Sequence, residues 1–358
     1  MAEQRALWVS TASRGGISSY VRTMRRTPLW GEWRIRHIAT HRDGSTIWKI
    51  LVFAAGALRF AVELICFRPD VIHLHSGSRG SFARKAILFW ISRPSRVPVV
   101  FHMHGSGFQE DYESSPPLVR AVIRTTLCHV SAFVTLGELW AERMRDIVPN
   151  ARIVAVPNGV NPARRVPQTT GDKPVHVVFL GRIGDHKGTF TLLDAWAKLA
   201  CEPWFNTANG SIATLTVAGD GEVDRARRRV RELCIGGTVE IRDWLSEAAV
   251  GQLLDCAQVL VLPSRNEGQP MAVLEAMARG LCVITTGVGG LPEMIGEGCG
   301  VLIAPDDSEA IATALARVIV APELRAEYGC AAYKRIVEHF DTRVVGRRLD
   351  ALYREVRS

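Results

Sequence analysis

Two glutamates eight residues apart bracket a candidate helix start in SRNEGQPMAVLEAMARG, residues 264–280. Pro270 suits a first helical turn, where its missing N–H costs nothing, and Gly280 suits the helix end. A helix start offers unpaired N–H groups and a positive dipole end. Glu267 and Glu275 add hydrogen-bond acceptors. The segment is thus a candidate ligand site at a helix start. The alternative is that Glu267 caps the helix and Glu275 is a surface residue.

Two cations and two glycines form further candidate anion sites. Arg182 and Lys187 lie in the glycine-rich segment GRIGDHKG, which follows the apolar run VHVVFLG. Two cations in such a turn can neutralise a diphosphate. Gly15 and Gly16 follow the first apolar run, and the backbone amides there could approach an anion closely. Taken alone, the segment GRIGDHKG is equally well a solvated loop, and the glycine pair is equally well an ordinary tight turn.

Histidines lie at the ends of two apolar runs. His104 ends the run VVFHMH and precedes Gly105. We expect His102 on the opposite face of that strand, and His73 and His75 to be structural or supporting residues. The chain has no Asp-x-Asp pair, and its 8 Cys form no CxxC. Neither a divalent-metal motif nor a zinc motif is therefore indicated.

The net charge of +8 is divided unevenly along the 358 residues. Residues 1–170 hold 23 Lys/Arg and 11 Asp/Glu, a net of +12, and the rest holds 21 and 25, a net of −4. This predicts that the first half faces an anionic surface or ligand. With 47% hydrophobic and 22% charged residues the composition is that of a folded protein. It excludes a disordered or collagen-like chain. No nucleic-acid-binding motif is evident.

Short apolar runs alternate with helical segments along the whole chain, which predicts parallel sheets covered on both faces. The fold class is therefore α/β, with two doubly wound Rossmann-like domains and an interdomain cleft. We expect an N-terminal domain over 1–165, a second domain over 166–341, and a last helix over 342–358 that packs back on the first. The predicted strands are 6–10, 34–39, 71–75, 99–104, 132–136, 152–156, 175–181, 213–219, 238–243, 258–264, 282–286 and 300–305.

The most apolar segment is 50–67, ILVFAAGALRFAVELICF. Arg59 and Glu63 within it make a membrane-spanning helix costly. A buried crossover helix is the favoured interpretation, and a helix that lies on a bilayer surface is the alternative.

The order of these motifs resembles the family 4 glycosyltransferases, which have the GT-B fold and retain the anomeric configuration. The glutamate segment is similar to the family's E-G-x-P-x-x-x-L-E motif, and the resemblance covers nearly the whole chain. Its other matching segments are RGGISSYV (14–21), PDVIHLH (69–75), FHMHG (101–105), VPNGV (156–160), GRIGDHKG (181–188), AGDGE (218–222) and TTGVGGLPEMI (285–295).

The resemblance implies a role for each candidate residue. Arg182 and Lys187 would hold the diphosphate of a nucleotide sugar, Glu267 the sugar hydroxyls and Glu275 the ribose. His104 would lie beside the anomeric carbon and, with Glu267, Arg182 and Lys187, form the catalytic set. The remaining donor-binding residues would be Gly15, Gly16, Arg242, Asp243, Trp244, Gly268, Gln269, Pro270 and Met271.

The resemblance further implies a hexosyltransferase with no metal or other cofactor. The likeness of 76–90 to bacterial exopolysaccharide and lipopolysaccharide enzymes suggests a polyprenyl-diphosphate-linked oligosaccharide as acceptor. The protein would then be peripheral on the inner face of the cytoplasmic membrane. Arg and Trp residues in 20–36 suit such an anionic membrane surface. The donor base and sugar stay open, with GDP-mannose and UDP-hexoses both considered. The alternatives are a soluble acceptor, another GT-B sugar-nucleotide enzyme, or a sugar-nucleotide-binding protein without activity.

Overall fold

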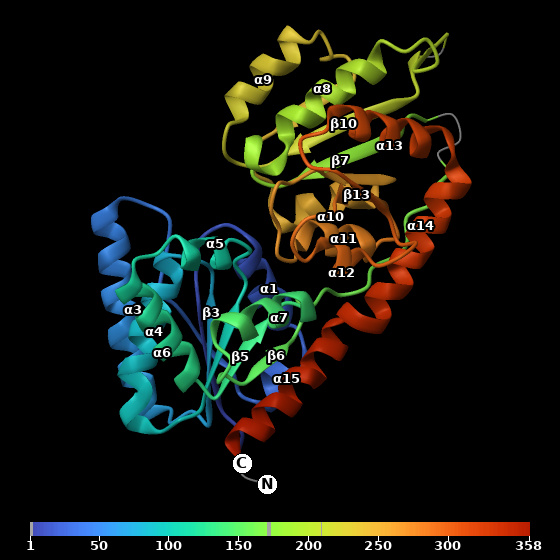
Figure 1. Ribbon diagram of the computed structural model, residues 1–358. Helices are drawn as coiled ribbons and strands as arrows, with labels where there is room; N and C mark the ends of the chain where they lie inside the picture. Colours follow the sequence, from blue (N-terminus) through green and yellow to red (C-terminus); the bar gives the residue numbers. More distant parts are fainter. Residues whose placement is uncertain (1–2, 170–172, 209) are drawn as a thin grey trace. The chain divides into compact units, whose positions relative to one another are not determined.

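A computed structural model describes residues 3–169, 173–208 and 210–358. It divides the chain into two compact units, Met1–Val160 with Phe340–Ser358 and Asn161–His339. Figure 1 shows both units.

The first unit is built on a six-stranded parallel sheet in the order β2-β1-β3-β4-β5-β6. Its strands are β1 (Ala6–Ser10), β2 (Arg36–Ala39), β3 (Val71–Ser76), β4 (Val99–Met103), β5 (Ala132–Thr135) and β6 (Ile153–Ala155). Its helices are α1 (Gly16–Met24), α2 (Pro28–Glu32), α3 (Thr46–Cys66), α4 (Gly80–Ser92), α5 (Phe108–Glu113), α6 (Pro117–His129), α7 (Glu138–Ile147) and α15 (Thr342–Arg357).

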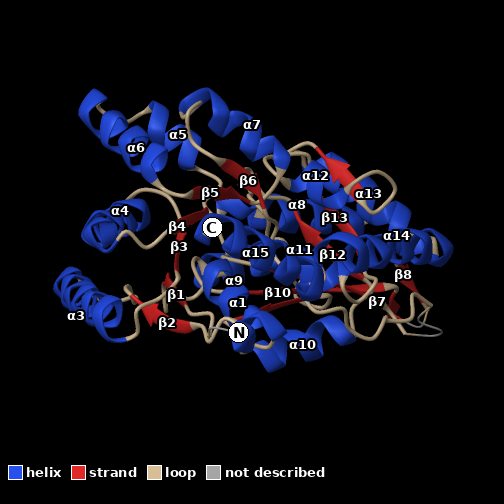
Figure 2. Ribbon diagram, turned by 90° about the horizontal axis from the view of Figure 1, so that it is seen from below, coloured by secondary structure: helices blue, strands red, loops and turns tan. Residues whose placement is uncertain are grey.

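The two faces of this sheet carry different cores. Ile72 and Leu74 of β3 and Phe101 of β4 face a hydrophobic cluster with α3, α4 and α6. The alternate residues of the same strands point the other way, toward α1 and α15, because side chains along a strand alternate between faces. Figures 1 and 2 both show α3, α4 and α6 together on one side of the sheet and α1 and α15 on the other.

The second unit is also a six-stranded parallel sheet, in the order β11-β10-β7-β12-β13-β14. Its strands are β7 (Val175–Leu180), β10 (Ala213–Ala218), β11 (Val239–Arg242), β12 (Val259–Leu262), β13 (Cys282–Thr286) and β14 (Val301–Ile303), with a small hairpin of β8 (Asn206–Thr207) and β9 (Gly210–Ser211). Its helices are α8 (Thr189–Ala200), α9 (Val223–Glu232), α10 (Glu247–Asp255), α11 (Met271–Met277), α12 (Leu291–Ile295), α13 (Ser308–Val320) and α14 (Pro322–Arg335).

The predicted fold class is confirmed, since both sheets are parallel and covered by helices on both faces. Each predicted strand matches an observed one to within two residues at either end. Buried on both faces, such strands show as continuous apolar runs in sequence. We expected the first domain to end at residue 165, and in the structure the first unit ends at Val160.

The segment 20–36 does not form the exposed Arg and Trp surface that the sequence suggested. Trp33 is fully buried, and its Nε1 donates a hydrogen bond of 2.8 Å to Asp350 Oδ1 of α15. The ring of Trp30 lies 5.3 Å from that of Trp8, edge to face. The tryptophans of this segment therefore serve the contact between the sheet and the last helix.

Candidate functional site

The loops after β7 and β12 meet at the centre of the second sheet. β7 and β12 are neighbours, and the strand order reverses between them, because β10 and β11 extend the sheet to one side and β13 and β14 to the other. Ligands of open α/β sheets bind at such a reversal, at the carboxyl ends of the strands. The loop after β7 carries Arg182 and Lys187, and the loop after β12 carries Glu267. The topology thus brings together three residues that are up to 85 positions apart in sequence.

Lys187 and Glu267 form an ion pair at this point. The Lys187 Nζ lies 2.5 Å from the Glu267 Oε1, and the Ser264 hydroxyl donates to the same oxygen at 2.8 Å. The carboxylate of Glu267 is buried, whereas the Lys187 side chain is about a quarter exposed. A buried carboxylate is stable only when it is paired and hydrogen-bonded. The pair therefore fixes one cation and one acceptor at the strand ends.

Two glycines allow the surrounding loops to pack tightly. Gly188 has a φ of +70°, and a Cβ there would lie 2.0 Å from the Pro263 carbonyl oxygen. Gly289 has a φ of +55°, and a Cβ there would lie 1.9 Å from the Glu267 carbonyl oxygen. The Gly290 N–H donates to that same oxygen at 3.1 Å. Only glycine allows both the backbone angle and the close approach, so the loop after β13 holds the Glu267 peptide in place.

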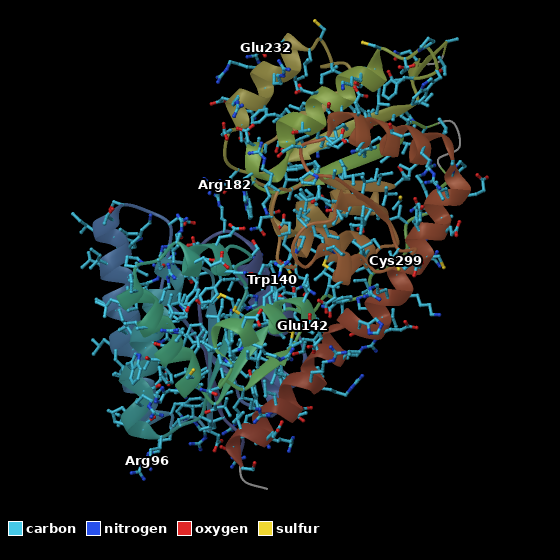
Figure 3. The ribbon with its side chains drawn as sticks, viewed as in Figure 1. Arg96, Trp140, Glu142, Arg182, Glu232 and Cys299 are labelled. Carbon is cyan, nitrogen blue, oxygen red and sulfur yellow. The ribbon has the colours of Figure 1, made fainter. Side chains whose placement is uncertain are left out.

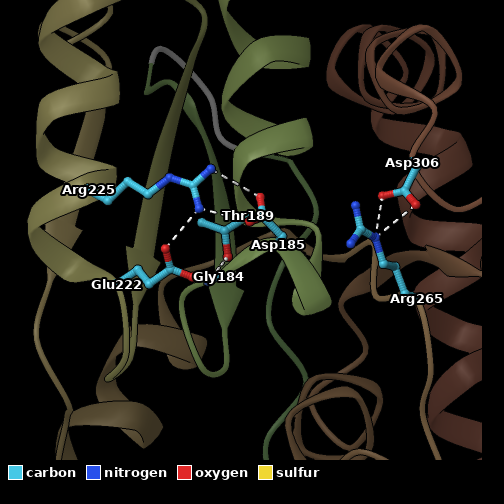
Figure 4. Close-up of polar contacts among 7 residues, drawn as sticks. All are labelled: Gly184, Asp185, Thr189, Glu222, Arg225, Arg265 and Asp306. Atoms are coloured by element: carbon cyan, nitrogen blue, oxygen red, sulfur yellow. Dashed lines mark hydrogen bonds and ion pairs between the residues drawn. The ribbon is translucent and has the colours of Figure 1, made fainter.

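The turn that carries Arg182 and Lys187 is braced by polar contacts (Figure 4). The Arg225 guanidinium of α9 donates to Asp185 Oδ2 and to Glu222 Oε2, both at 2.8 Å. Within the turn, the Gly184 N–H donates to the Thr189 hydroxyl at 3.1 Å. Arg182, labelled in Figure 3, is exposed and directly follows the first glycine after β7. A cation on a braced turn can meet an anion with little reorganisation.

The helix after Glu267 is shorter than expected. α11 runs from Met271 to Met277, with Pro270 before its first residue, whereas the sequence predicted a helix that ends at Gly280. Gly280 does adopt a positive φ, of +69°, but three residues beyond the helix end. Glu275 lies half-buried one turn into α11. The remaining candidates of this segment all lie in or beside the loop that joins β12 to α11: Gly268, Gln269, Pro270 and Met271.

Three further donor-binding candidates lie farther along the same edge. Arg242 ends β11, which is separated from β7 by β10. Its guanidinium lies 2.7 Å from the Glu240 carboxylate, a pair that raises the pKa of Arg242. Asp243 pairs with Arg227 at 2.7 Å, and the Trp244 side chain is 42% exposed. Trp244 is therefore the group of the three with a large exposed apolar surface.

Four histidines, here called the histidine cluster, gather in the first unit. His73 and His75 lie on β3, His102 on β4, and His104 directly after β4. The rings of His102 and His104 are stacked 4.1 Å apart, as are those of His73 and His75. The expectation that His102 lies on the opposite face from His104 is wrong, because residues two apart on a strand share a face.

His104 is held by several neighbours. Its Nε2 lies 3.1 Å from His75 Nδ1, and the Asn158 side chain hydrogen-bonds to its ring. The Tyr20 ring is centred 5.2 Å away. Burial lowers the pKa of His104 to about 3, so its imidazole is neutral near pH 7. Sequence reasoning missed Tyr20, Asn158 and the role of His75, although each lies in a motif that it singled out.

The cluster continues inward from His104. His73 Nε2 lies 3.2 Å from His102 Nδ1, and the other ring nitrogen of His73 contacts the Tyr353 hydroxyl of α15. Burial lowers the pKa of His73, His75 and His102 well below the usual value. Among the described residues, ring nitrogens of these three lie within 4.8 Å of one another, which is close enough to share a metal ion. The sequence expectation of a site without metal stays a prediction.

Gly15 and Gly16 lie at the carboxyl end of β1. Strand order reverses there too, between β1 and β3. Gly15 precedes the first residue of α1 with a φ of +134°, and no atom lies within 4 Å of a Cβ built on it. The loop therefore leaves its backbone open at the edge of the sheet where ligands bind.

The chain thus consists of two doubly wound units, one of which carries a lysine–glutamate pair at its strand reversal. Two family models match the chain: "Glycosyl transferase 4-like domain" over residues 9–159 and "Glycosyl transferases group 1" over residues 161–335. The chain belongs to this family, the family 4 glycosyltransferases, and is a glycosyltransferase.

Relatives with assigned roles agree with this. The chain is 25% identical to the "Putative colanic acid biosynthesis glycosyltransferase WcaL" of Escherichia coli K12, over 94% of this chain and 86% of that protein. It is 28% identical to a glycogen synthase of Mycobacterium tuberculosis H37Rv, over 78% of this chain and 67% of that protein.

Solved structures share the fold. A sucrose-phosphate synthase from Thermosynechococcus elongatus superposes with a TM-score of 0.80 at 18% identity, over 99% of both chains. HepE from Anabaena, in complex with UDP and glucose, superposes with a TM-score of 0.74 at 15% identity, over 98% of this chain and 100% of that one.

Proposed function

We propose that this glycosyltransferase moves a hexose from a nucleotide-diphosphate sugar to a lipid-linked glycan acceptor, without a metal and with retention of the anomeric configuration. The observation that carries the proposal is the Lys187–Glu267 pair at the strand reversal of the second unit. In this ion pair, a cation that would bind the diphosphate lies in direct contact with a carboxylate that would bind the sugar hydroxyls.

The donor would be recognised by groups along one sheet edge. Arg182 and Lys187 neutralise the diphosphate, and Glu267 accepts hydrogen bonds from the sugar. Glu275 accepts hydrogen bonds from the ribose, and the exposed ring of Trp244 stacks on the base. The structural likeness to HepE, which was solved with UDP and glucose, supports a nucleotide-sugar donor.

The transfer step needs charge stabilisation more than a nucleophile. The bond between the anomeric carbon and the diphosphate oxygen breaks, and a bond to the acceptor hydroxyl oxygen forms on the same face. The acceptor proton goes to the leaving phosphate oxygen. Arg182 and Lys187 stabilise the negative charge that develops on the diphosphate, in place of a metal. The neutral His104 beside the anomeric carbon adds no positive charge there.

We further propose a polyprenyl-diphosphate-linked oligosaccharide as the acceptor, in the synthesis of a bacterial surface polysaccharide. The protein would work peripherally on the inner face of the cytoplasmic membrane. The likeness to WcaL, whose name places it in colanic acid biosynthesis, supports this direction. The likeness to a glycogen synthase keeps transfer to a soluble glycan as the second candidate.

Kinetics of matched lysine variants test the site. We expect Lys187→Met to lower kcat/KM by roughly a hundredfold or more, since one preorganised charge at a developing anion contributes about that much. Because this change leaves Glu267 unpaired, the double variant Lys187→Met/Glu267→Gln is measured beside it, and we expect at least the same loss, since Glu267 also contributes to the site. The control is Lys198→Met, which removes a lysine paired with Glu309 in the same unit.

Each outcome has a clear meaning. Melting curves establish that the variants are folded, and the anomeric configuration of the product is read by proton NMR. The proposal predicts wild-type kinetics for Lys198→Met and unchanged turnover in excess EDTA. Near-native turnover of folded Lys187→Met would contradict the site assignment, and an inverted product would contradict retention.

A further inference from the structure

An exposed apolar surface covers one side of the first unit. Of the 18 large hydrophobic side chains that are exposed among the described residues, 13 lie on α3, α4 and α6. These three helices contact one another in that order and lie on the same face of the sheet (Figures 1 and 2). We call this set the outer helical face. Its exposed members are Ile47, Trp48, Ile50, Leu51, Leu58, Val62, Ile65, Ile87, Trp90, Ile91, Leu118, Val119 and Val122.

The helix α3 is apolar on both of its sides. Its inner side carries Gly56 and Phe60, which are buried against the sheet. Its outer side carries a stripe at helical spacing that includes Ile47 at 73% exposure, Leu58 at 69% and Ile65 at 73%. A helix that is apolar all round is normally buried, so an exposed outer stripe indicates that something else covers it. The favoured interpretation of this segment as a buried crossover helix is therefore correct for its inner side only.

The charges around this face are almost all positive. Residues 42–68, 79–96 and 116–129, which contain the three helices and their flanks, hold 11 Lys/Arg, of which Lys85 is buried, and two Asp/Glu. One of the two acids, Glu63, is paired with Arg36 at 2.7 Å. Exposed bases include Lys49 and Arg59 on α3 and Arg124 on α6. An apolar stripe with a basic rim matches the chemistry of an anionic bilayer surface.

From this apolar stripe and basic rim we infer that the outer helical face docks on a bilayer of anionic lipid, with α3 lying in the interfacial plane. Its 21 residues span about 30 Å at the usual helical rise, parallel to the membrane. No helix among the described residues is long and apolar enough to cross a membrane. Trp48 and Trp90 both lie on this face, where amphipathic rings suit the head-group region.

A second copy of this chain fits the face less well. A two-fold contact would place the same patch against itself, and the basic rim of one copy would then meet the basic rim of the other. With ten bases outside the core and two acids in the defining segments, that contact is repulsive, whereas a layer of lipid phosphates is attractive.

The face also lies near the edge of the sheet where ligands bind. Helices that connect parallel strands run antiparallel to them, so the first turns of α3 and α6 lie at the carboxyl ends of the strands. Those turns carry Ile47, Trp48 and the most exposed of the apolar residues, Leu118, at 77%. This inference deepens the proposed function and rests on it for the acceptor: a lipid-linked acceptor would reach the first unit along this membrane-facing edge.

Cosedimentation with vesicles tests the inference. The vesicles contain phosphatidylglycerol and phosphatidylcholine in equal parts, or phosphatidylcholine alone. We expect the wild type to bind the anionic vesicles, and the variant Leu51→Gln/Leu58→Gln/Ile65→Gln to bind them at least about tenfold more weakly, since three apolar side chains no longer enter the interface. The control is Leu302→Gln/Val320→Gln/Val337→Gln, three exposed residues of the second unit, which should bind as the wild type does.

The basic rim is tested separately. We expect Lys49→Gln/Arg59→Gln/Arg124→Gln to lower binding to anionic vesicles severalfold, while the exposed pair Arg228→Gln/Arg231→Gln on α9 leaves binding unchanged. Equal binding of the wild type and the α3 variant would overturn the inference. So would a wild type that ignores both kinds of vesicle, or a wild-type dimer that the α3 variant disperses without any lipid.

Donor turnover distinguishes this inference from the proposed function. Release of nucleoside diphosphate with a soluble acceptor analogue does not need a membrane, so the α3 variant should retain it at the wild-type rate. A protein that binds vesicles through α3 but transfers no sugar would disprove the proposed function and leave the docking surface standing. Transfer to a lipid-linked acceptor that is unchanged by loss of vesicle binding would contradict the link between the two.

Discussion

His104 owes its geometry to residues that need not touch substrate. His75 Nδ1 and Asn158 hydrogen-bond to it, and Tyr20 packs beside it. Because the ring is neutral and hydrogen-bonded to His75, its tautomer and orientation depend on that neighbour. His75 is therefore a positioning residue of the proposed reaction.

Two substitutions of His75 separate positioning from packing. We expect His75→Phe, which fills the space but cannot hydrogen-bond, to lower kcat roughly tenfold with little change in the donor KM, since one hydrogen bond is lost. His75→Asn, whose amide can take the place of Nδ1, should keep most of the activity. Equal kcat values for both variants would contradict a positioning role, whether those values are high or low.

At this scale the sequence predicted residue types better than residue contacts. Arg182, Lys187, Glu267 and His104 were selected from motifs and from their expected position after strands, and the structure places each of them after a strand. The direct contact of Lys187 with Glu267 was not predicted, because the two are 80 residues apart and meet only through the pairing of β7 with β12. Ser264 was also missed, since a serine in a loop has no distinctive pattern.

At the strand ends of the second unit, two neighbouring loops contact each other mainly through their backbones. The turn at Gly188, between the short helical turn Asp185–Lys187 and α8, packs against the Pro263 carbonyl of the neighbouring loop. Both the positive φ and the close approach exclude any other residue. The position of Lys187 is thus set by its glycine neighbour.

A glycine substitution tests this element directly. We expect Gly188→Ala to destabilise the protein by a few kcal/mol and to weaken donor binding, because backbone must move to admit the methyl group. Gly237→Ala is the matched control, since no atom lies within 4 Å of its Cβ. Urea unfolding curves give both free energies. A Gly188→Ala variant as stable as the control would show that this close packing is not required.

The elements themselves were largely predictable, and their surroundings were not. Continuous apolar runs predict strands that are buried on both faces, and all twelve were found in this way. Apolar residues on every side of α3 led to a buried helix, because sequence alone cannot tell protein from another apolar environment on the outer side. The prediction of an exposed Arg and Trp surface in 20–36 was wrong because Trp33 is covered by α15. That helix lies more than 300 residues later in the sequence, so local patterns could not reveal the contact.

The molecule as a whole carries an unusual set of buried neutral histidines. Burial lowers the pKa of His37 to about 4, that of His104 to about 3, and those of His73, His75 and His102 well below the ordinary 6.5. In the unfolded chain all five take up protons near pH 6.5. The unfolded state therefore binds more protons than the folded state below that pH, and acid favours unfolding.

The free energy of unfolding should thus fall steeply with acid. We expect a loss of at least about 1.4 kcal/mol per pH unit between about pH 6 and pH 4, where His37 and His104 are neutral in the folded state and protonated in the unfolded chain. Urea unfolding at pH 7, 6 and 5 measures the slope. A free energy that is flat over this range would mean that the cluster is open to water or already charged.

The charge division along the sequence did not locate the exposed apolar face. A net of +12 in residues 1–170 led to the segment 20–36, whereas the structure shows bases around an exposed apolar face on α3, α4 and α6. Periodicity reports which residues share a helix face. It does not report which face the sheet covers, and that depends on the connections between strands.

The central claim is that the strand reversal of the second unit binds a nucleotide diphosphate through Lys187 without a metal. The most direct test is the melting temperature with a panel of UDP-, GDP- and ADP-sugars in excess EDTA. A donor at a hundred times its Kd stabilises the folded state by about 2.7 kcal/mol. We predict that the sugars of one nucleotide raise the melting temperature of the wild type and of Lys198→Met, but not that of Lys187→Met. An equal rise in Lys187→Met, or no rise in the wild type with any of the sugars, would contradict the claim.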